Sequence, residues 1–164
     1  MPAASEAIVV NTGPLLALQA CEASHLLVEL HAPVLVPDVV LREILRGPEA
    51  GAEHGLRTSL SGAEIVPLMG PPPPLVAAHL DPGEAAVLGL ALERGIALVA
   101  IDERRGRLVA RSLGLRVTGS IGILLRAKRL GLIETVGPRL DAMREGGVWL
   151  SPRLLAEALR AAGE

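Results

Sequence analysis

The residues best suited to chemistry are oxygen donors that follow short apolar runs. Asn11 ends the run IVVN, and Asp102 ends the run ALVAID. Ligands of open α/β sheets bind beyond the carboxyl ends of the strands, so both positions are candidates for a site. Glu84 falls in the first turn of the helix predicted before the Asp102 strand, on the same side of the sheet. Glu43 falls in the helix after residues 34–37, where an inward-pointing rotamer brings a fourth oxygen group to the rim.

These four side chains favour a divalent cation. Three carboxylates and an amide at one end of a sheet repel one another unless a cation neutralises them. Oxygen-only ligands select Mg²⁺ or Mn²⁺ over zinc. The pattern therefore indicates a metal site formed by Asn11, Glu43, Glu84 and Asp102.

Each residue also has a simpler structural interpretation. Glu84 could be the reciprocal residue of a capping box, and Asp102 could be the N-cap of its own helix. Glu43 could lie on a solvated helix face. Asn11 could cap the next helix or hold a turn. Taken singly, none of these residues establishes a site.

The elements that position these residues alternate between strand and helix. Short runs rich in Val, Ile and Leu predict strands at residues 7–10, 34–36, 64–68, 97–101 and 115–118. Segments of helical spacing separate them, which predicts an α/β fold of three layers, α/β/α, with a central parallel sheet of about five strands.

Helix boundaries are marked by capping residues and prolines. Asp81 is a predicted N-cap, followed by Pro82 and a capping-box Glu84, and this helix runs to about Gly95. Glu103 is predicted to be a surface residue. Further helices are expected after Pro37 and from Arg104, Ser120, Pro138 and Ser151. Residues 71–74, all proline, are expected to form a stiff surface connection.

Length and composition narrow the class of protein. The chain has 164 residues, 50% hydrophobic and 21% charged, which fits one domain over 1–164, with a core of about 7–135 and a C-terminal helical extension of about 136–164. No apolar run approaches the roughly 20 residues of a spanning helix, and the start resembles no secretory signal. The single Cys21 fits a reducing compartment. We therefore expect a cytoplasmic protein without a membrane partner.

Charge is distributed unevenly along the chain. The net charge of −2 averages over regions of opposite charge. Residues 1–103 contain 4 Arg against 13 Asp and Glu, whereas residues 104–129 contain 7 Arg and one Lys and no acid. A basic stretch after an acidic half points to a polyanionic partner. The alternative is that about half of these cations pair with acids elsewhere or coat helices.

Four stretches resemble, in order, the motifs of the PIN domain family, in its stand-alone prokaryotic branch. IVVNTGPLLAL is similar to the first motif and VPDVVLREIL to the second. LDPGEAAVLGLALERGIALVAIDERRGRLVARSLGL is similar to the third and fourth, and VTGSIGILLRAKRLGLI to the signature that follows. The resemblance covers nearly the whole chain, and the long third stretch is its most specific part.

The resemblance implies a metal-dependent ribonuclease, as in VapC-like toxins of toxin–antitoxin modules, with one or two Mg²⁺ or Mn²⁺ ions in an acidic pocket. It places the four metal ligands at Asn11, Glu43, Glu84 and Asp102, the last three also being catalytic. Supporting hydroxyls are implied at Thr12, Thr118 and Ser120. Asn11 replaces the usual Asp, and its amide can coordinate a cation but brings no negative charge.

The implied reaction is attack of water on an RNA phosphodiester, with the cation activating the water and stabilising charge. Glu84 is the expected proton acceptor. Arg104, Arg105 and Arg107 follow Asp102 directly and are the expected RNA contacts. Since the chain has no Phe or Tyr for base stacking, recognition of phosphates should dominate and depend strongly on salt.

Two other functions stay open. In the first, Asn11 marks a catalytically weakened PIN domain that acts as an RNA-binding or protein-interaction module. In the second, a phosphatase-like hydrolase would need a nucleophilic Asp where the chain has Asn11. The expected protein partners are a small antitoxin and a second copy of the chain in a dimer. Trp149 is expected in the core or at an interface.

Overall fold

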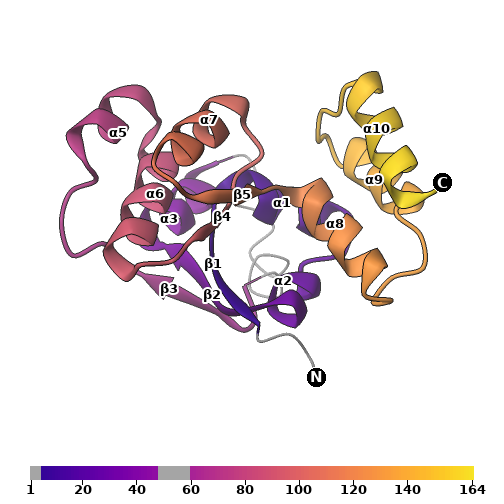
Figure 1. Ribbon diagram of the computed structural model, residues 1–164, viewed down its shortest axis with the longest axis horizontal. Coiled ribbons are helices and arrows are strands. Elements are labelled where there is room, and N and C mark those ends of the chain that lie inside the picture. Colours follow the sequence, from indigo (N-terminus) through magenta and orange to yellow (C-terminus); the bar gives the residue numbers. More distant parts are fainter. Residues whose placement is uncertain (1–4, 48–59) are drawn as a thin grey trace.

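The computed structural model describes residues 5–47 and 60–164 of the chain (Figure 1). Within them lies a five-stranded parallel sheet of strand order β3-β2-β1-β4-β5. The strands are β1 (Glu6–Val10), β2 (His31–Pro37), β3 (Ala63–Val66), β4 (Leu98–Ala100) and β5 (Arg116–Thr118). The predicted parallel sheet of five strands between helices is therefore confirmed.

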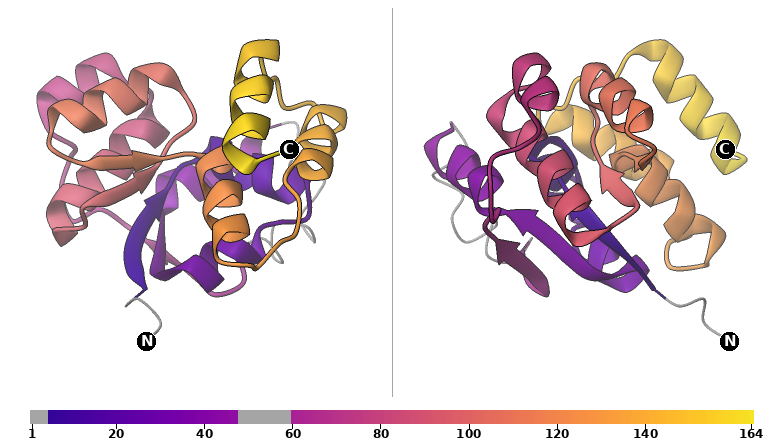
Figure 2. Two further views of the ribbon diagram at one scale, coloured as in Figure 1. Left: turned by 45° about the vertical axis from the view of Figure 1, so that its right-hand side comes forward. Right: turned by 60° about the vertical axis from the view of Figure 1, so that its left-hand side comes forward.

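Helices cover both faces of the sheet (Figure 2). α6 contacts β1, β2 and β4 on one face, while α2 contacts β2 and α8 contacts β5 on the other. The helices are α1 (Thr12–Ala20), α2 (His25–Leu30), α3 (Asp38–Arg46), α5 (Pro74–His79), α6 (Pro82–Arg94), α7 (Arg104–Ser112), α8 (Ser120–Arg129), α9 (Gly137–Glu145) and α10 (Pro152–Ala162). None of the helices in the described residues is both long and apolar enough to cross a membrane.

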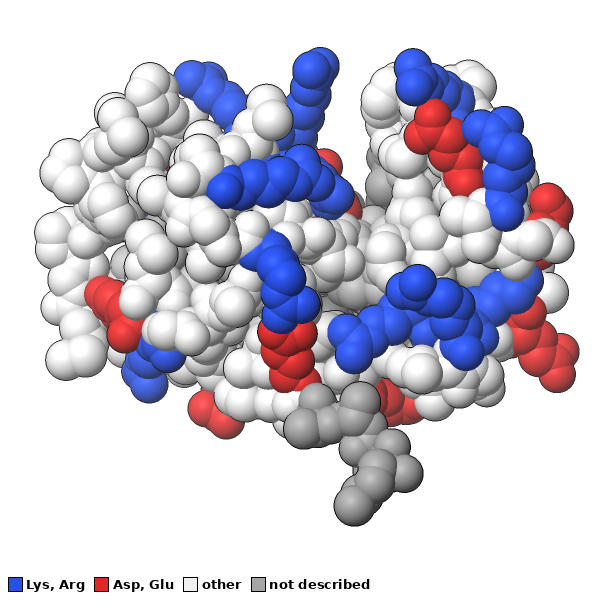
Figure 3. Space-filling view, in the orientation of Figure 1, with Lys and Arg blue, Asp and Glu red and all other residues white. Residues whose placement is uncertain are grey.

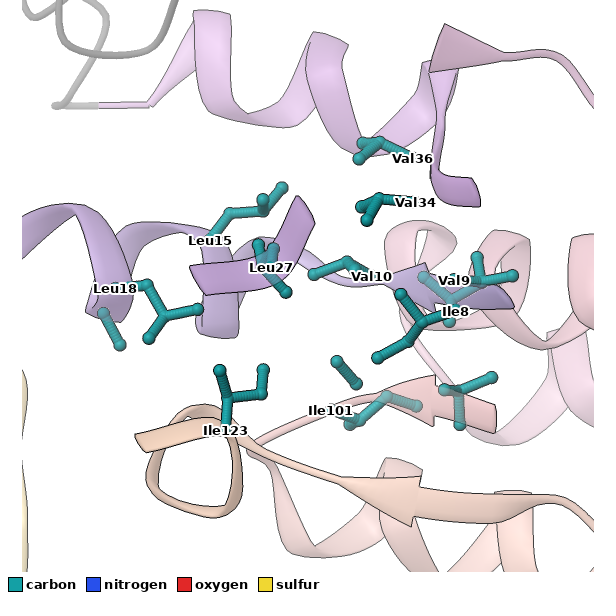
Figure 4. Packing of buried hydrophobic residues seen from close by; sticks show 14 of the residues in the cluster. Ile8, Val9, Val10, Leu15, Leu18, Leu27, Val34, Val36, Ile101 and Ile123 are labelled. Atoms are coloured by element: carbon teal, nitrogen blue, oxygen red, sulfur yellow. The ribbon is translucent and has the colours of Figure 1, made fainter. Parts of the chain in front are cut away.

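Burial on both faces of the sheet explains why β1 ends in three consecutive apolar residues. Ile8, Val9 and Val10 are all fully buried, because a central parallel strand is covered on both faces (Figure 4). β1 pairs with β4 through Val9 opposite Val99 and Val10 opposite Ala100. The residues that follow these two strands therefore leave the sheet at the same edge.

The prolines account for two differences from the predicted boundaries. β3 ends at Val66 rather than at residue 68, because Pro67 has no N–H with which to extend the ladder. Pro74 begins α5 rather than ending a connection, since proline suits the first turn of a helix. Cys21 is buried as a free thiol.

Trp149 is the clearest error for the core. Its side chain lies in the connection between α9 and α10 and is 83% exposed. The prediction that it belongs to the core is therefore wrong, and only the prediction of an interface stays open. Its neighbours Val148 and Leu150 pack against the core, which leaves the residue between them facing outward.

One side chain, that of Glu164 after α10, links the end of α8 to the start of α9. Glu164 Oε1 accepts hydrogen bonds from Lys128 Nζ and Val136 N, both at 2.7 Å, and its Oε2 accepts one from Gly137 N at 2.8 Å. We call this arrangement the C-terminal clasp. It places a carboxylate at the N-terminus of α9, where the helix dipole favours negative charge.

Candidate active site

Asn11 and Asp102 follow two neighbouring strands of the sheet, β1 and β4. Asn11 follows β1 directly, and its N–H donates to the carbonyl of Ala100 in β4 at 3.0 Å. Asp102 leaves the sheet two residues after β4. Gly13 lies against Asp102, because a Cβ on Gly13 would lie 3.7 Å from Asp102 Oδ2. The first turn of α1 is therefore next to the Asp102 carboxylate.

Glu43 approaches the same turn from α3. Thr12 Oγ1 donates to Glu43 Oε2 over 3.4 Å, a long hydrogen bond. On its other side the carboxylate lies against Gly83 in the first turn of α6, so closely that a Cβ there would overlap it. Glu43 thus points inward, as the helix register predicts, and lies between the N-termini of α1 and α6.

Glu84 is the most buried acid of the site, with 3% of its surface exposed. Its N–H donates to Asp81 Oδ1 at 2.8 Å, so Asp81 is the predicted N-cap of α6. Its Oε1 lies against Gly106 of α7, where an added Cβ would come within 2.6 Å. The Glu84 carboxylate is therefore enclosed between α6 and α7.

Two buried side-chain oxygen atoms of this site lack a hydrogen-bond partner in the described part of the chain. Among the described residues, Asn11 Oδ1 and Glu84 Oε1 are the buried side-chain atoms that lack a hydrogen-bond partner. Asn11 makes no side-chain cap on α1, so capping does not account for it. An unpaired buried polar atom costs about 1–3 kcal/mol. Both unpaired atoms are oxygen acceptors, so a bound cation would provide the missing interaction for each.

Asp102 does not cap its own helix. The N-cap of α7 is Glu103, whereas Asp102 Oδ1 accepts from the N–H of Ser120, the first residue of α8, at 2.7 Å. Gly119 makes this approach possible, because a Cβ on it would lie 2.5 Å from Asp102 Oδ1 and 2.9 Å from Arg107 Nη1. Asp102 is thus held by α8 through one oxygen, and its Oδ2 faces Gly13.

The electrostatics show a shortage of positive charge. Burial, followed by the charges of Asp81 and Glu103, raises the pKa of Glu84 to about 7. Burial and then Asp81 raise the pKa of Glu43. Although part of Asp102 faces solvent, enclosure of its carboxylate raises its pKa, against the lowering by the Ser120 hydrogen bonds and Arg107. Each acid would be stabilised as an anion by a bound cation.

Two acids were missed as site residues by sequence reasoning. Asp81, Glu84 and Glu103 each offer a carboxylate oxygen, and these oxygens lie within 4.8 Å of one another. Asp81 was interpreted as a helix start and Glu103 as a surface residue. Both interpretations hold, and each residue also belongs to an acidic group with the dimensions of a metal site.

Four glycines lie directly against the acids of the site, and their positions in the sequence could have indicated it. A Cβ on Gly13 would lie 3.6 Å from the Asp102 side chain, in ordinary contact, whereas at Gly83, Gly106 and Gly119 a Cβ would crowd Glu43, Glu84 and Asp102, respectively. A glycine at the start of a helix or after a strand leaves room for such an approach. Helix-start glycines beside predicted site acids therefore mark which acids converge.

The three predicted hydroxyl groups lie in different surroundings. Thr12 contacts Glu43, and Ser120 hydrogen-bonds Asp102. The Thr118 hydroxyl instead faces the first turn of α8, where a Cβ on Gly122 would lie 2.5 Å from it. The structure thus brings Thr12 and Ser120 to site acids, and Thr118 to a helix turn.

The predicted RNA contacts also differ from one another. Arg104 and Arg105 are exposed at the start of α7 and form no ion pair within the described residues. Arg107 is half-buried, and its Nη1 donates to the carbonyl of Ile101 at 2.8 Å. Arg107 therefore forms part of the wall beside Asp102, while the other two face solvent.

The cations of residues 104–129 form a basic band on one face of the molecule (Figure 3). Lys and Arg side chains lie there over α7, on one side of a hollow between α7 and the C-terminal helices, and over α8 below that hollow. Of the eight cations, Arg116 pairs with Glu6 and Lys128 pairs with Glu164 in the described part of the chain. Two of the eight are thus paired with acids, and the alternative that others only coat exposed helix faces stays open.

The comparison with known families agrees with this architecture. The family model of the PIN domain family DUF3368 matches residues 7–164. No curated protein matches the chain. PIN domains are generally nucleases, so the fold is of a nuclease type. From the match and the five-stranded parallel sheet together, we conclude that this chain belongs to the PIN domain family.

Proposed function

We propose that the protein is an endoribonuclease that depends on Mg²⁺ or Mn²⁺ and hydrolyses RNA phosphodiesters. The observation that carries the proposal is the pair of buried, unpartnered acceptors, Asn11 Oδ1 and Glu84 Oε1, beside acids whose pKa values are raised. A folded protein rarely leaves such atoms unsatisfied without a ligand or a catalytic reason. The match to a family of nucleases supports the same conclusion.

The donor set fits a hard divalent cation. Asn11, Glu43, Glu84 and Asp102 would hold the ion through oxygen, and Asp81 and Glu103 extend the acidic group around Glu84. Oxygen ligands of this kind suit Mg²⁺ and Mn²⁺. When bound, such a cation supplies Lewis-acid stabilisation of the phosphate and lowers the pKa of a water molecule.

The protein's own residues have distinct tasks in this proposal. Glu84 is the proposed proton acceptor, because its buried carboxylate lies within the acidic group; its pKa of about 7 belongs to the protein without a cation. Ser120 orients Asp102 through its N–H, and Arg107 lines the wall on the same side. Arg104 and Arg105 are free to contact phosphates next to the acidic group.

A biological setting follows from the same resemblance. We infer that the protein is the toxin of a toxin–antitoxin module, in which a small antitoxin covers the acidic pocket, and that it acts as a homodimer in the cytoplasm. The alternative function is a catalytically weakened domain that binds RNA or protein. The neutral Asn11 supports this alternative, because it adds no charge to the ligand set.

Cleavage of RNA tests the proposal directly. Purified protein is incubated with a structured RNA at low salt, with Mn²⁺ or with EDTA, alongside Asp102→Ala and Asn11→Asp. Cleavage by the wild type that needs Mn²⁺ and disappears in Asp102→Ala is the expected result. If only Asn11→Asp cleaves, the protein is a weakened nuclease. If neither cleaves any of a panel of RNAs, the nuclease proposal is wrong.

A further inference from the structure

We propose that the RNA is bound along an extended track, which runs from the acidic group along α8 to Arg126 and Arg129 at the far end of that helix. This inference rests on the proposed ribonuclease function and names the form of its substrate. The partner is the phosphodiester backbone of an RNA several nucleotides long. A substrate of one or two nucleotides would not reach these arginines.

Of the eight cations in the basic band, two form ion pairs and one donates to the backbone, which leaves five free within the described residues. Arg116 and Lys128 are neutralised by ion pairs, and Arg107 donates to a backbone carbonyl. The remaining cations of the basic band form no ion pair within the described residues: Arg104, Arg105, Arg111, Arg126 and Arg129. Free cations thus occur at both ends of the band, beside the acidic group and at the end of α8.

α8 leads from the acidic group to the end of the basic band. The helix begins at Ser120, whose N–H lies 2.7 Å from Asp102 Oδ1, and it ends at Arg129. One side of the helix is buried through Ile123, Leu124 and Ala127. Arg126 is half-buried and Arg129 is exposed, so both reach solvent on the open side. α8 therefore connects the site to free positive charge.

The length of α8 sets the length of the RNA that fills the track. An α-helix rises 1.5 Å per residue, so Arg129 lies about 14 Å along the axis from Ser120. Phosphates of one strand advance about 3.4 Å per nucleotide in a stacked helix. The track therefore spans about four nucleotides beyond the phosphate at the acidic group. An RNA that fills it must be longer than a tetranucleotide on that side.

The surface favours a polyanion over other ligands. No Asp or Glu occurs between residues 104 and 129, so the band carries no acid of its own to repel phosphates. The basic band also begins next to the acidic group, because Arg104 and Arg105 follow Glu103 directly in the chain. Cations in the last turn of α8 also complement its dipole, a purely structural role that the experiment has to separate.

The test compares a long and a short RNA. Cleavage of an RNA of about 20 nucleotides and of a tetranucleotide is measured with Mn²⁺ for the wild type and for the double variant Arg126→Gln with Arg129→Gln. The longer RNA is about five times the length of the track, and the tetranucleotide is too short to fill the track while it places a phosphate at the acidic group. Arg94→Gln, an exposed arginine on α6 outside the band, is the matched control. RNA affinity is measured in parallel by fluorescence anisotropy in EDTA at several salt concentrations.

We expect the double variant to raise KM for the long RNA about tenfold at low salt while kcat stays within a factor of two. The tetranucleotide should be unaffected, which a loss of folding or of helix stability would not produce. The slope of log affinity against log salt should fall by about 1.4, that is about 0.7 for each phosphate that the protein no longer neutralises. The control should match the wild type.

Three results would overturn the track. They are an unchanged KM for the long RNA, an equal loss on both substrates, and an unchanged salt slope. An unchanged RNA affinity would assign the band to an acidic protein partner instead. If the wild type cleaves no RNA at all, the proposed function fails, and the anisotropy series still decides the track.

Discussion

The pKa values of two glutamates, Glu164 and Glu84, are shifted in opposite directions by their surroundings. Glu164 in the C-terminal clasp accepts hydrogen bonds from Lys128, Val136 and Gly137, and these bonds lower its pKa to about 2. Glu84 at the carboxyl edge of the sheet has one oxygen without a partner, and burial raises its pKa to about 7. The same side chain is thus an anion in one region and is poised to hold a proton in the other.

The two pKa shifts distinguish a carboxylate that stabilises the fold, in the C-terminal clasp, from acids that destabilise it, at the carboxyl edge of the sheet. The clasp contains its own positive charge and N–H donors, so its carboxylate contributes to stability without help. The carboxyl edge gathers acids without matching cations, which costs stability in the free protein. Such a cost persists where the site has a use for it. We therefore expect the two regions to respond oppositely to substitution, to cations and to pH.

The largest effect is expected from a pair of glycine substitutions. In Gly119→Ala, the new Cβ displaces the Asp102 carboxylate and Arg107, and cleavage should fall about a hundredfold, since a misplacement of 1 Å can cost that much. Gly137→Ala is the matched change in the clasp, with its Cβ 3.1 Å from Glu164 Oε2. It should lower Tm and leave kcat unchanged. Equal activity of the two variants would contradict the comparison.

A divalent cation should stabilise the wild type at pH 8. At a hundred times its Kd, a ligand adds about 2.7 kcal/mol, which for a domain of this size raises Tm by about 5–10 °C. Glu84→Gln should lose most of this shift in a thermal melt with Mn²⁺, whereas Glu164→Gln should keep it. A full shift in the Glu84 variant would mean that the ion binds without this side chain.

Loss of charge in the clasp should give a smaller change. Glu164→Gln removes the ion pair with Lys128 and weakens the bonds to the N-terminus of α9, so Tm should fall by a few degrees. The lowered pKa means that this stabilisation is complete above pH 4.5 and is lost as pH falls toward 2. The Tm values of wild type and variant should therefore converge as pH falls through 2, and a difference that persists below that pH would exclude the charge as its cause.

The stability of the free carboxyl edge should also depend on pH, in the direction opposite to that of the clasp. Because Glu84 keeps its proton in the folded protein up to a pKa of about 7, the unfolded chain releases protons first, and stability falls as pH rises from 4.5 to 7. Glu84→Gln mimics the protonated acid and should be more stable than the wild type above pH 7. Melts in EDTA across this range measure the difference, and a flat difference curve would show that the raised pKa is wrong.

Much of the site was predictable because strand ends are visible in a sequence. Asn11 and Asp102 each terminate an apolar run, and their strands are neighbours in the sheet. Glu84 was expected at the same rim because it lies in the first turn of its helix, and Glu43 because an inward-pointing rotamer would reach it. Asp81 and Glu103 were missed because each has a sufficient local explanation, as an N-cap and as a surface residue. Their membership of an acidic group with Glu84 becomes visible only in the tertiary structure.

The sequence by itself determined the parallel α/β architecture, the family and the edge of the sheet that carries the acids. The architecture and the edge follow from local patterns, namely apolar runs, caps and the order of the elements, and the family follows from the resemblance of four stretches to its motifs. Only the tertiary structure decided which partner each polar group finds. Asp102 caps α8 rather than α7, Glu164 is satisfied by three donors, and Trp149 faces outward. Hydrogen bonding and burial depend on segments that are distant in the chain, so no local pattern contains them.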